Sequence, residues 1–122
     1  MSLSPHRISL LYVDDEPDLL ETAKQFLEMK DEFAVKTALS AAEALGILQE
    51  SMYDGIISDY QMPEMDGIEL LKNIRSHYPD IPFILFTGRG REEVVIQAFD
   101  AGADYYVQKG GEVRSQFREL SL

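Results

Sequence analysis

The chain has 122 residues, the length of one ordinary domain, and its 45% hydrophobic and 27% charged residues are typical of a globular protein. Its formal net charge is −11, so the surface repels phosphate backbones and direct binding to nucleic acid is not expected. The absence of cysteine excludes disulfides and thiolate chemistry, and no apolar run approaches the roughly 20 residues that a membrane span needs. We expect residues 1–122 to form a single domain, with residues 1–3 set aside as an expression scar.

Five short apolar runs predict β-strands. Four of them are rich in Ile, Val, Leu, Phe or Tyr with little alternation, which is typical of parallel strands that are covered on both faces. The predicted strands are Ile8–Val13, Phe33–Ala38, Gly55–Ser58, Pro82–Phe86 and Tyr105–Val107.

Helix signals separate these runs. The first helix begins at Pro17, a residue favoured in the first turn, and the second begins with a capping box made by Ser40 and Glu43. Asp66 predicts the N-cap of a third helix. A fourth carries the apolar residues Val94, Val95, Ala98 and Phe99 and ends at Gly102, and a fifth, from about Glu112, carries Val113, Phe117 and Leu120 at helical spacing.

The order of elements is strand then helix, five times. Strands joined in this way run parallel through right-handed crossovers. The sequence therefore predicts an α/β fold with a five-stranded, parallel, doubly wound sheet of the flavodoxin-like kind, in the strand order 2-1-3-4-5.

Polar side chains follow the carboxyl ends of four of these strands. Asp14 and Asp15 follow the first strand, Asp59 follows the third, and Thr87 and Lys109 follow the fourth and fifth. Ligand sites of open α/β sheets lie at this edge, and the first and third strands are neighbours in the predicted order. Three carboxylates brought together there repel one another, and a hard dication such as Mg²⁺ relieves that repulsion.

Such a site suits phosphoryl transfer, because carboxylates are an established class of nucleophile toward phosphoryl groups. Asp59 would attack in line, while Lys109 and a hydrogen bond from Thr87 offset the charge on the phosphoryl oxygens. Each residue also has an ordinary structural explanation, since aspartates form turns and cap helices and a lysine before glycines is usually a surface cation. The joint occurrence at four strand ends favours the functional interpretation.

These motifs resemble those of response-regulator receiver domains over essentially the whole chain. They are the Asp14-Asp15 pair, Asp59 within Asp-Tyr-Gln-Met-Pro-Glu-Met-Asp-Gly, Thr87-Gly88, and Ala-Gly-Ala-Asp-Tyr-Tyr-Val-Gln-Lys ending at Lys109. The resemblance implies the receiver domain of a two-component or phosphorelay system, excised from a longer chain or acting as a stand-alone regulator. It also implies a cytoplasmic protein.

The resemblance assigns a role to each site residue. Asp59 would accept a phosphoryl group from the phosphohistidine of a histidine kinase or phosphotransfer domain. Asp15, Asp59 and the backbone carbonyl of Gln61 would bind Mg²⁺, for which Mn²⁺ can substitute, and Asp14 would act through water. Thr87 and Lys109 would bind the phosphoryl oxygens.

The same resemblance predicts how the signal leaves the domain. Tyr106 matches the family's switch aromatic, and the face formed by the fourth helix, the fifth strand and the fifth helix would meet an output domain or protein. Such a domain assists its own phosphorylation and dephosphorylation but is not an enzyme. One departure is the Gly110-Gly111 pair, which stands where the family usually has proline after the lysine.

Three other readings share parts of this pattern. A flavodoxin needs a Ser-, Thr- or Gly-rich loop after its first strand, where this chain has the acidic Asp14 to Asp18. An aspartate-nucleophile phosphatase would place its nucleophile in a DxD pattern at the same point. The serious alternative is an interaction module that works without phosphorylation, but pure binding does not require the full acid set with Thr87 and Lys109.

Overall fold

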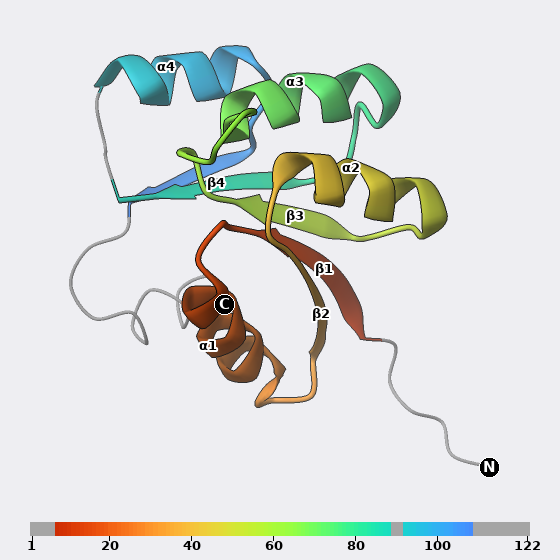
Figure 1. Cartoon of the computed structure of the whole chain (residues 1–122). Coiled ribbons are helices and arrows are strands. Elements are labelled where there is room, and N and C mark those ends of the chain that lie inside the picture. The colour runs from red at the N-terminus through yellow and green to blue at the C-terminus, as the bar shows by residue number, and fades with distance from the viewer. Residues whose placement is uncertain (1–6, 89–91, 109–122) are drawn as a thin grey trace.

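The computed structural model describes residues 7–88 and 92–108 and contains a parallel five-stranded sheet in the order β2-β1-β3-β4-β5. Figure 1 shows the strands and the helices that cover them. The strands are β1 (Ile8–Val13), β2 (Phe33–Ala38), β3 (Gly55–Ser58), β4 (Phe83–Thr87) and β5 (Tyr105–Gln108). The predicted flavodoxin-like topology is confirmed.

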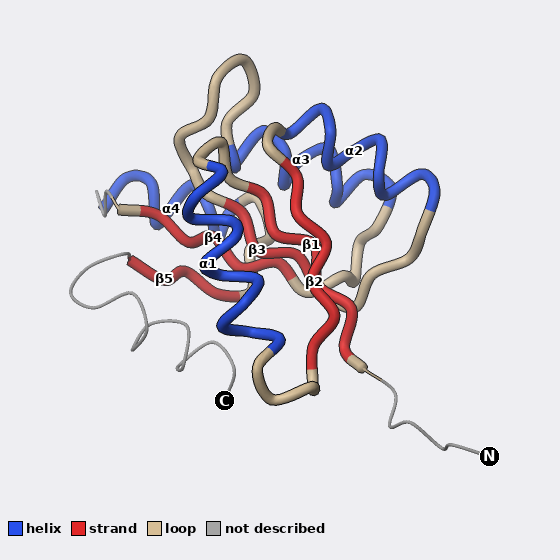
Figure 2. The backbone as a smooth tube through the Cα atoms, turned by 60° about the horizontal axis from the view of Figure 1, so that its bottom comes forward, coloured by secondary structure: helices blue, strands red, loops and turns tan. Residues whose placement is uncertain are grey.

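The described helices lie on both faces of the sheet, as a doubly wound fold requires. Helix α1 packs on one face, and α2, α3 and α4 pack on the other (Figures 1 and 2). The helices are α1 (Pro17–Glu28), α2 (Ala41–Glu50), α3 (Gly67–His77) and α4 (Glu92–Asp100). The predicted fifth helix, from Glu112, lies outside the described residues.

Two hydrophobic clusters form the core, one on each face of the sheet. Under α1, Tyr12 and Ile57 pack with Leu20 and Leu27 of that helix. The larger cluster, on the other face, joins alternate residues of the strands to the buried sides of α2, α3 and α4. Successive residues of a strand point to opposite faces of the sheet. The same alternation sets the face toward which the side chain at the end of each strand points.

The helix signals correspond to observed caps. Ser40 Oγ accepts a hydrogen bond from the Glu43 N–H (3.1 Å), which is the Ser40 half of the predicted capping box, and Pro17 occupies the first turn of α1. Asp66 forms a complete capping box with Glu69, of which the sequence analysis predicted only the Asp66 half. Gly102 has a φ of 104°, the left-handed conformation expected after α4.

Three details of the sequence prediction differ from the structure. Strand β4 runs from Phe83 to Thr87 rather than from Pro82 to Phe86, and β5 extends one residue further than predicted, to Gln108. Proline has no N–H to donate to a ladder, which accounts for the later start of β4. The helical spacing predicts Phe99 on the apolar face of its helix, yet its side chain is 49% exposed, whereas Val94 and Ala98 of that helix are buried.

Strand β2 forms one edge of the sheet, and its outward N–H at Val35 does not face open solvent. Glu28, the last residue of α1, accepts a hydrogen bond from this N–H through its carboxylate (Val35 N to Glu28 Oε2, 2.8 Å). The connection ties the end of α1 to the edge of the sheet. Among the described helices, none is long and apolar enough to cross a membrane.

Candidate functional site

Three aspartates converge at the carboxyl ends of the neighbouring strands β1 and β3. Val13 is in register with Ser58, so the residues that follow them leave the sheet side by side. The Asp59 N–H donates to Val13 O (2.9 Å), so the backbone pairing of β1 and β3 continues as far as Asp59. Asp14, Asp15 and Asp59 each offer a carboxylate oxygen, and these oxygens lie within 4.8 Å of one another.

The three carboxylates differ in their exposure to solvent. Asp14 is fully buried, Asp59 is half-buried and Asp15 is exposed. Asp14 Oδ1 accepts a hydrogen bond from the Glu16 N–H, and Asp59 Oδ1 accepts one from the Tyr60 N–H, both at 2.9 Å. These backbone donors orient the two less exposed carboxylates, so the cluster is arranged in advance of any ligand.

A polar cleft of about 620 Å³ opens above this cluster. Its lining residues come from the start of α1 and from the loop between β3 and α3: Asp15, Glu16, Asp59, Tyr60, Gln61, Met62, Pro63 and Asp66. The cleft therefore gives a small charged group access to the Asp59 carboxylate from solvent.

The loop that follows Asp59 is fixed at both ends. Glu64 adopts a φ of 71°, a left-handed conformation that is uncommon for a residue other than glycine. Beyond it, Asp66 caps α3 by accepting from the N–H groups of Ile68 and Glu69, both at 2.9 Å. The Gly67 N–H donates back to Tyr60 O at 2.7 Å, which closes the loop.

Gly67 is a site residue that the sequence analysis missed. A Cβ added to it would lie 2.2 Å from Asp59 O and 2.9 Å from Leu85 Cδ1, so only glycine fits without a shift of backbone. Ser58 Oγ also donates to Asp59 O, at 2.9 Å. The backbone of Asp59 is thus held from two sides. The Asp-Gly pair in the sequence suggested a turn, but not this close approach.

Tyr12 is a second residue that sequence reasoning overlooked. It is fully buried and lies two positions before Asp14, on the same face of β1. Burial raises the pKa of its phenol strongly, and the nearby charges of Asp14 and Asp59 raise that pKa further. Tyr12 therefore presents a neutral, polar ring beneath the acid cluster. A tyrosine within an otherwise largely aliphatic run was the available signal.

Three other predicted residues, Thr87, Gln61 and Tyr106, lie within the described part of the chain. Thr87 ends β4 and is buried, and the Gln61 backbone lies in the loop that lines the cleft. Tyr106 is in register with Leu85 and packs, half-buried, against the core on the face covered by α4. Burial raises the pKa of its phenol. Lys109, together with Gly110 and Gly111, lies outside the described residues.

The clustering of charge predicts a cost in stability. In the absence of metal, we expect Asp14→Asn to raise the free energy of unfolding by about 1 kcal/mol, because it removes one of three mutually repelling carboxylates. The asparagine oxygen can still accept from the Glu16 N–H. Thermal denaturation in the presence of chelator measures the change.

Asp18→Asn is the matched control for this prediction. Asp18 is exposed in the first turn of α1, where a negative charge favours the helix, so its loss is neutral or slightly destabilising. A destabilised Asp14→Asn variant in chelator would show that repulsion within the cluster does not limit stability.

Comparison with known proteins assigns this site to a family. The family model for the response regulator receiver domain matches residues 10–118. Response regulator Rre1 of Synechocystis is 38% identical over 104 residues, which are 84% of this chain and 45% of that protein. The transcriptional regulatory protein SrrA of Staphylococcus aureus is 35% identical over 100 residues, or 82% of this chain and 41% of that protein. The chain thus spans less than half the length of these relatives.

Solved structures agree with this assignment. A CheY-like response regulator receiver domain protein from Methanospirillum hungatei superposes with a TM-score of 0.85 at 29% identity, covering 94% of this chain and 91% of that one. Chemotaxis protein CheY4 of Vibrio cholerae gives a TM-score of 0.85 at 28% identity, covering 94% and 97%. With the family match over most of its length, and with the acid cluster in place, the chain belongs to the response-regulator receiver domains of two-component signalling.

Proposed function

We propose that Asp59 is the phosphoacceptor of this receiver domain and that its donor is the phosphohistidine of a histidine kinase or phosphotransfer domain. The observation that carries the proposal is the cluster of three carboxylates within 4.8 Å, with Asp59 on the wall of an open polar cleft. Of the three, Asp14 is fully buried, and the bond from the Tyr60 N–H sets the orientation of the Asp59 carboxylate.

The transfer is a single displacement at phosphorus. A carboxylate oxygen of Asp59 forms a bond to phosphorus while the phosphorus–nitrogen bond of the phosphohistidine breaks, and its electron pair stays on the imidazole. The phosphohistidine ring carries a proton on its other nitrogen, so the products are an aspartyl phosphate and a neutral histidine. Residues of this chain contribute mainly position and charge, because phosphoryl transfer needs little other covalent chemistry from the protein.

The donor set fits Mg²⁺, with Mn²⁺ as a substitute. Hard dications take oxygen ligands and keep several waters, and a cluster of carboxylates that is partly open to solvent offers both. Asp15, Asp59 and the Gln61 carbonyl would hold the ion directly, and Asp14 would do so through water. When bound, the ion offsets negative charge on the phosphoryl oxygens.

Two further residues would bind the phosphoryl oxygens. Thr87 supplies a hydroxyl donor at the end of β4, the strand beside β3. Lys109 supplies a cation after β5, by its resemblance to the family's lysine. Neither attacks phosphorus, so their loss should slow the transfer without moving its site.

The phosphoryl group would act on the face formed by α4, β5 and the segment after β5. Alternation places Thr87 and Tyr106 on the same face of the sheet, the one that α4 covers. A bond from Thr87 to the new phosphoryl oxygens would draw Thr87 toward Asp59, and Tyr106 would turn into the space that this movement leaves. The output domain or protein would then bind the remodelled face.

This domain is a signalling component, and we propose that it accepts a phosphoryl group and assists its own dephosphorylation without acting as an enzyme on other substrates. Its histidine kinase and its output partner act in the cytoplasm. An interaction module that works without phosphorylation is not favoured, because binding alone gives no reason for three repelling carboxylates. As a single domain, residues 1–122 would either belong to a longer regulator or act alone.

The test uses acetyl phosphate, a small phosphoryl donor. In Mg²⁺, we expect intact-mass spectrometry to show the gain of one phosphoryl group, and we expect Mg²⁺ alone to raise the melting temperature. Chelator should abolish both effects. Labelling and stability that are unchanged by chelator would show that the carboxylate cluster is not a metal site.

A further inference from the structure

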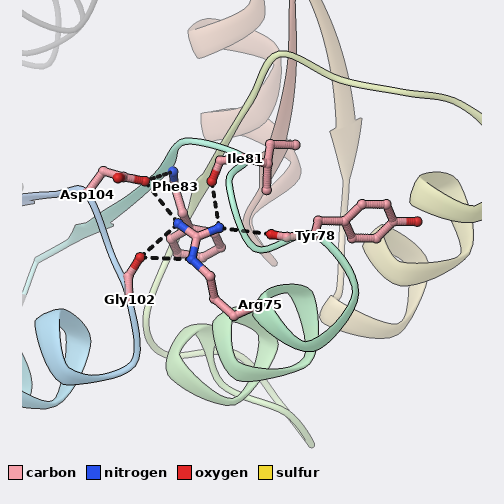
Figure 3. Close-up of polar contacts among 6 residues, drawn as sticks. All are labelled: Arg75, Tyr78, Ile81, Phe83, Gly102 and Asp104. Atoms are coloured by element: carbon pink, nitrogen blue, oxygen red, sulfur yellow. Dashed lines mark hydrogen bonds and ion pairs between the residues drawn. The ribbon is translucent and has the colours of Figure 1, made fainter.

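Arg75, near the end of α3, is bonded through every N–H of its guanidinium group. Nε and Nη2 donate to Gly102 O (3.0 and 2.8 Å), and Nη2 also donates to Asp104 Oδ2 (2.9 Å). Nη1 donates to Tyr78 O (3.2 Å) and Ile81 O (2.6 Å). The Arg75 side chain is 17% exposed, so its bonds to the three backbone carbonyls are partly shielded from water, and bonds from a charged donor are the stronger kind. Figure 3 shows the guanidinium between the loop after α3, which holds Tyr78 and Ile81, and the loop after α4, which holds Gly102 and Asp104.

Asp104 connects this arginine to the sheet. Its Oδ2 accepts from Arg75 and also from the Phe83 N–H (2.8 Å), and its own N–H donates to Phe83 O (2.9 Å). Phe83 is the first residue of β4, and Asp104 immediately precedes β5. The ion pair and the paired backbone therefore fix the starts of these two strands to the end of α3.

The same arginine holds the carboxyl end of α4. That helix closes with the Gly102 N–H donating to Phe99 O (3.1 Å) and the Ala103 N–H donating to Ala98 O (2.9 Å). A Cβ on Gly102 would lie 3.0 Å from Arg75 Nε, so the glycine provides both the left-handed φ of 104° and the room for the guanidinium. The end of α4 is thus bound to α3 through the Gly102 carbonyl.

The opposite end of α4 follows Thr87, the residue that would respond to a phosphoryl group. Helix α4 has nine residues and is therefore about 13 Å long. If its amino end is displaced while its carboxyl end stays bonded to Arg75, the helix rotates about that bonded end. We propose that Arg75 is the pivot of the switch: a positioning residue that keeps the carboxyl end of α4 and the start of β5 fixed while the amino end of α4 moves. This proposal rests on the proposed function of Asp59.

If Arg75 had only a structural role, it would stabilise the domain without affecting which residues respond to phosphorylation. An experiment can separate this role from that of a pivot. Beryllofluoride with Mg²⁺ mimics the aspartyl phosphate, and amide shifts of ¹⁵N-labelled protein report the response residue by residue. In the unaltered domain, we expect large shifts at Thr87 and at Glu93 to Val95, which decline along α4 and become minimal at Ala101 to Ala103. Shifts of equal size along the whole helix would overturn the pivot.

Conservative variants test the arginine itself. Arg75→Lys keeps the charge but cannot reproduce the five-donor fork, and Asp104→Asn keeps the shape but loses the ion pair. In both, we expect the shifts to extend through Ala101 to Ala103, and hydrogen exchange of the Ala103 amide to accelerate about tenfold. These variants avoid the loss of fold that Arg75→Ala risks. Lys72→Ala, an exposed change on the same helix, is the control and should retain the gradient.

The outcomes separate this proposal from the one on which it rests. Acetyl phosphate should label Arg75→Lys at the rate of the unaltered domain, because Arg75 lies at the opposite ends of the strands from the acid cluster. A normal labelling rate together with an unchanged gradient in Arg75→Lys would overturn the pivot and leave the proposed function standing. No beryllofluoride shift at Asp59 or Tyr60 in the unaltered domain would overturn both.

Discussion

We expect Asp59→Asn to abolish the gain of a phosphoryl group from acetyl phosphate while the fold persists. The substitution keeps the shape of the side chain and an oxygen that can accept from the Tyr60 N–H, but it removes the nucleophilic charge. We expect no labelling by intact-mass spectrometry under conditions that label the unaltered domain fully. Because one of three repelling charges is lost, the melting temperature in chelator should be unchanged or higher.

Asp54→Asn is the matched control for this loss. Asp54 precedes the other end of the same strand, where its carboxylate accepts from the Ser9 N–H, a bond that asparagine can also make. Its labelling should equal that of the unaltered domain. If Asp59→Asn still labels at the normal rate, the acceptor is another residue, and Asp14 and Asp15 are the next candidates.

Gly67→Ala should destabilise the domain by about 3 kcal/mol and also reduce its labelling. The added methyl group would meet Asp59 O at 2.2 Å, so either α3 or the end of β3 must shift. Overpacking of this kind costs roughly 1–3 kcal/mol, and here the neighbour is backbone rather than a flexible side chain. Chemical denaturation gives the stability, and the rate of acetyl phosphate labelling reports the displacement of Asp59.

Gly46→Ala provides a control of opposite sign. Gly46 lies within α2 with nothing within 4 Å of an added Cβ, so alanine should stabilise the helix by about 0.5–1 kcal/mol through its higher helix propensity. Equal effects at the two glycines would show that the contact between Gly67 and Asp59 is not tight in solution.

The architecture was predictable because its signals are local and mutually consistent. Apolar runs, helix caps at Ser40 and Asp66, and Gly102 after α4 all correspond to elements of the structure. The boundaries of β4 and β5 were less certain, since a strand ends where its ladder ends, and pairing depends on a neighbour distant in sequence. The exposure of Phe99 also depends on residues distant in sequence. Helical spacing shows which residues form an apolar stripe, but not how much of that stripe the sheet covers.

The site was predictable only in part. Side chains at strand ends can be located once the strand order is known, which is why the three aspartates were expected together. The contacts that hold them depend on distances between backbones. The approach of Gly67 to Asp59, the left-handed Glu64 and the bonding of Arg75 to the α4 end leave no periodic pattern in the sequence.

The hydrogen bond from the Val35 N–H to the Glu28 carboxylate also opposes the association of this domain with other copies of itself through the edge of the sheet. An exposed edge strand offers a template on which a strand of another chain can add, and such addition leads to aggregation. At β2, an incoming strand would have to displace a charged acceptor at 2.8 Å and then approach an acidic protein of net charge −11. A signalling domain must meet its partners repeatedly and release them. When the edge strand is not open to pairing, contacts with partners use side chains and are reversible. Association through an extended sheet would be nearly permanent.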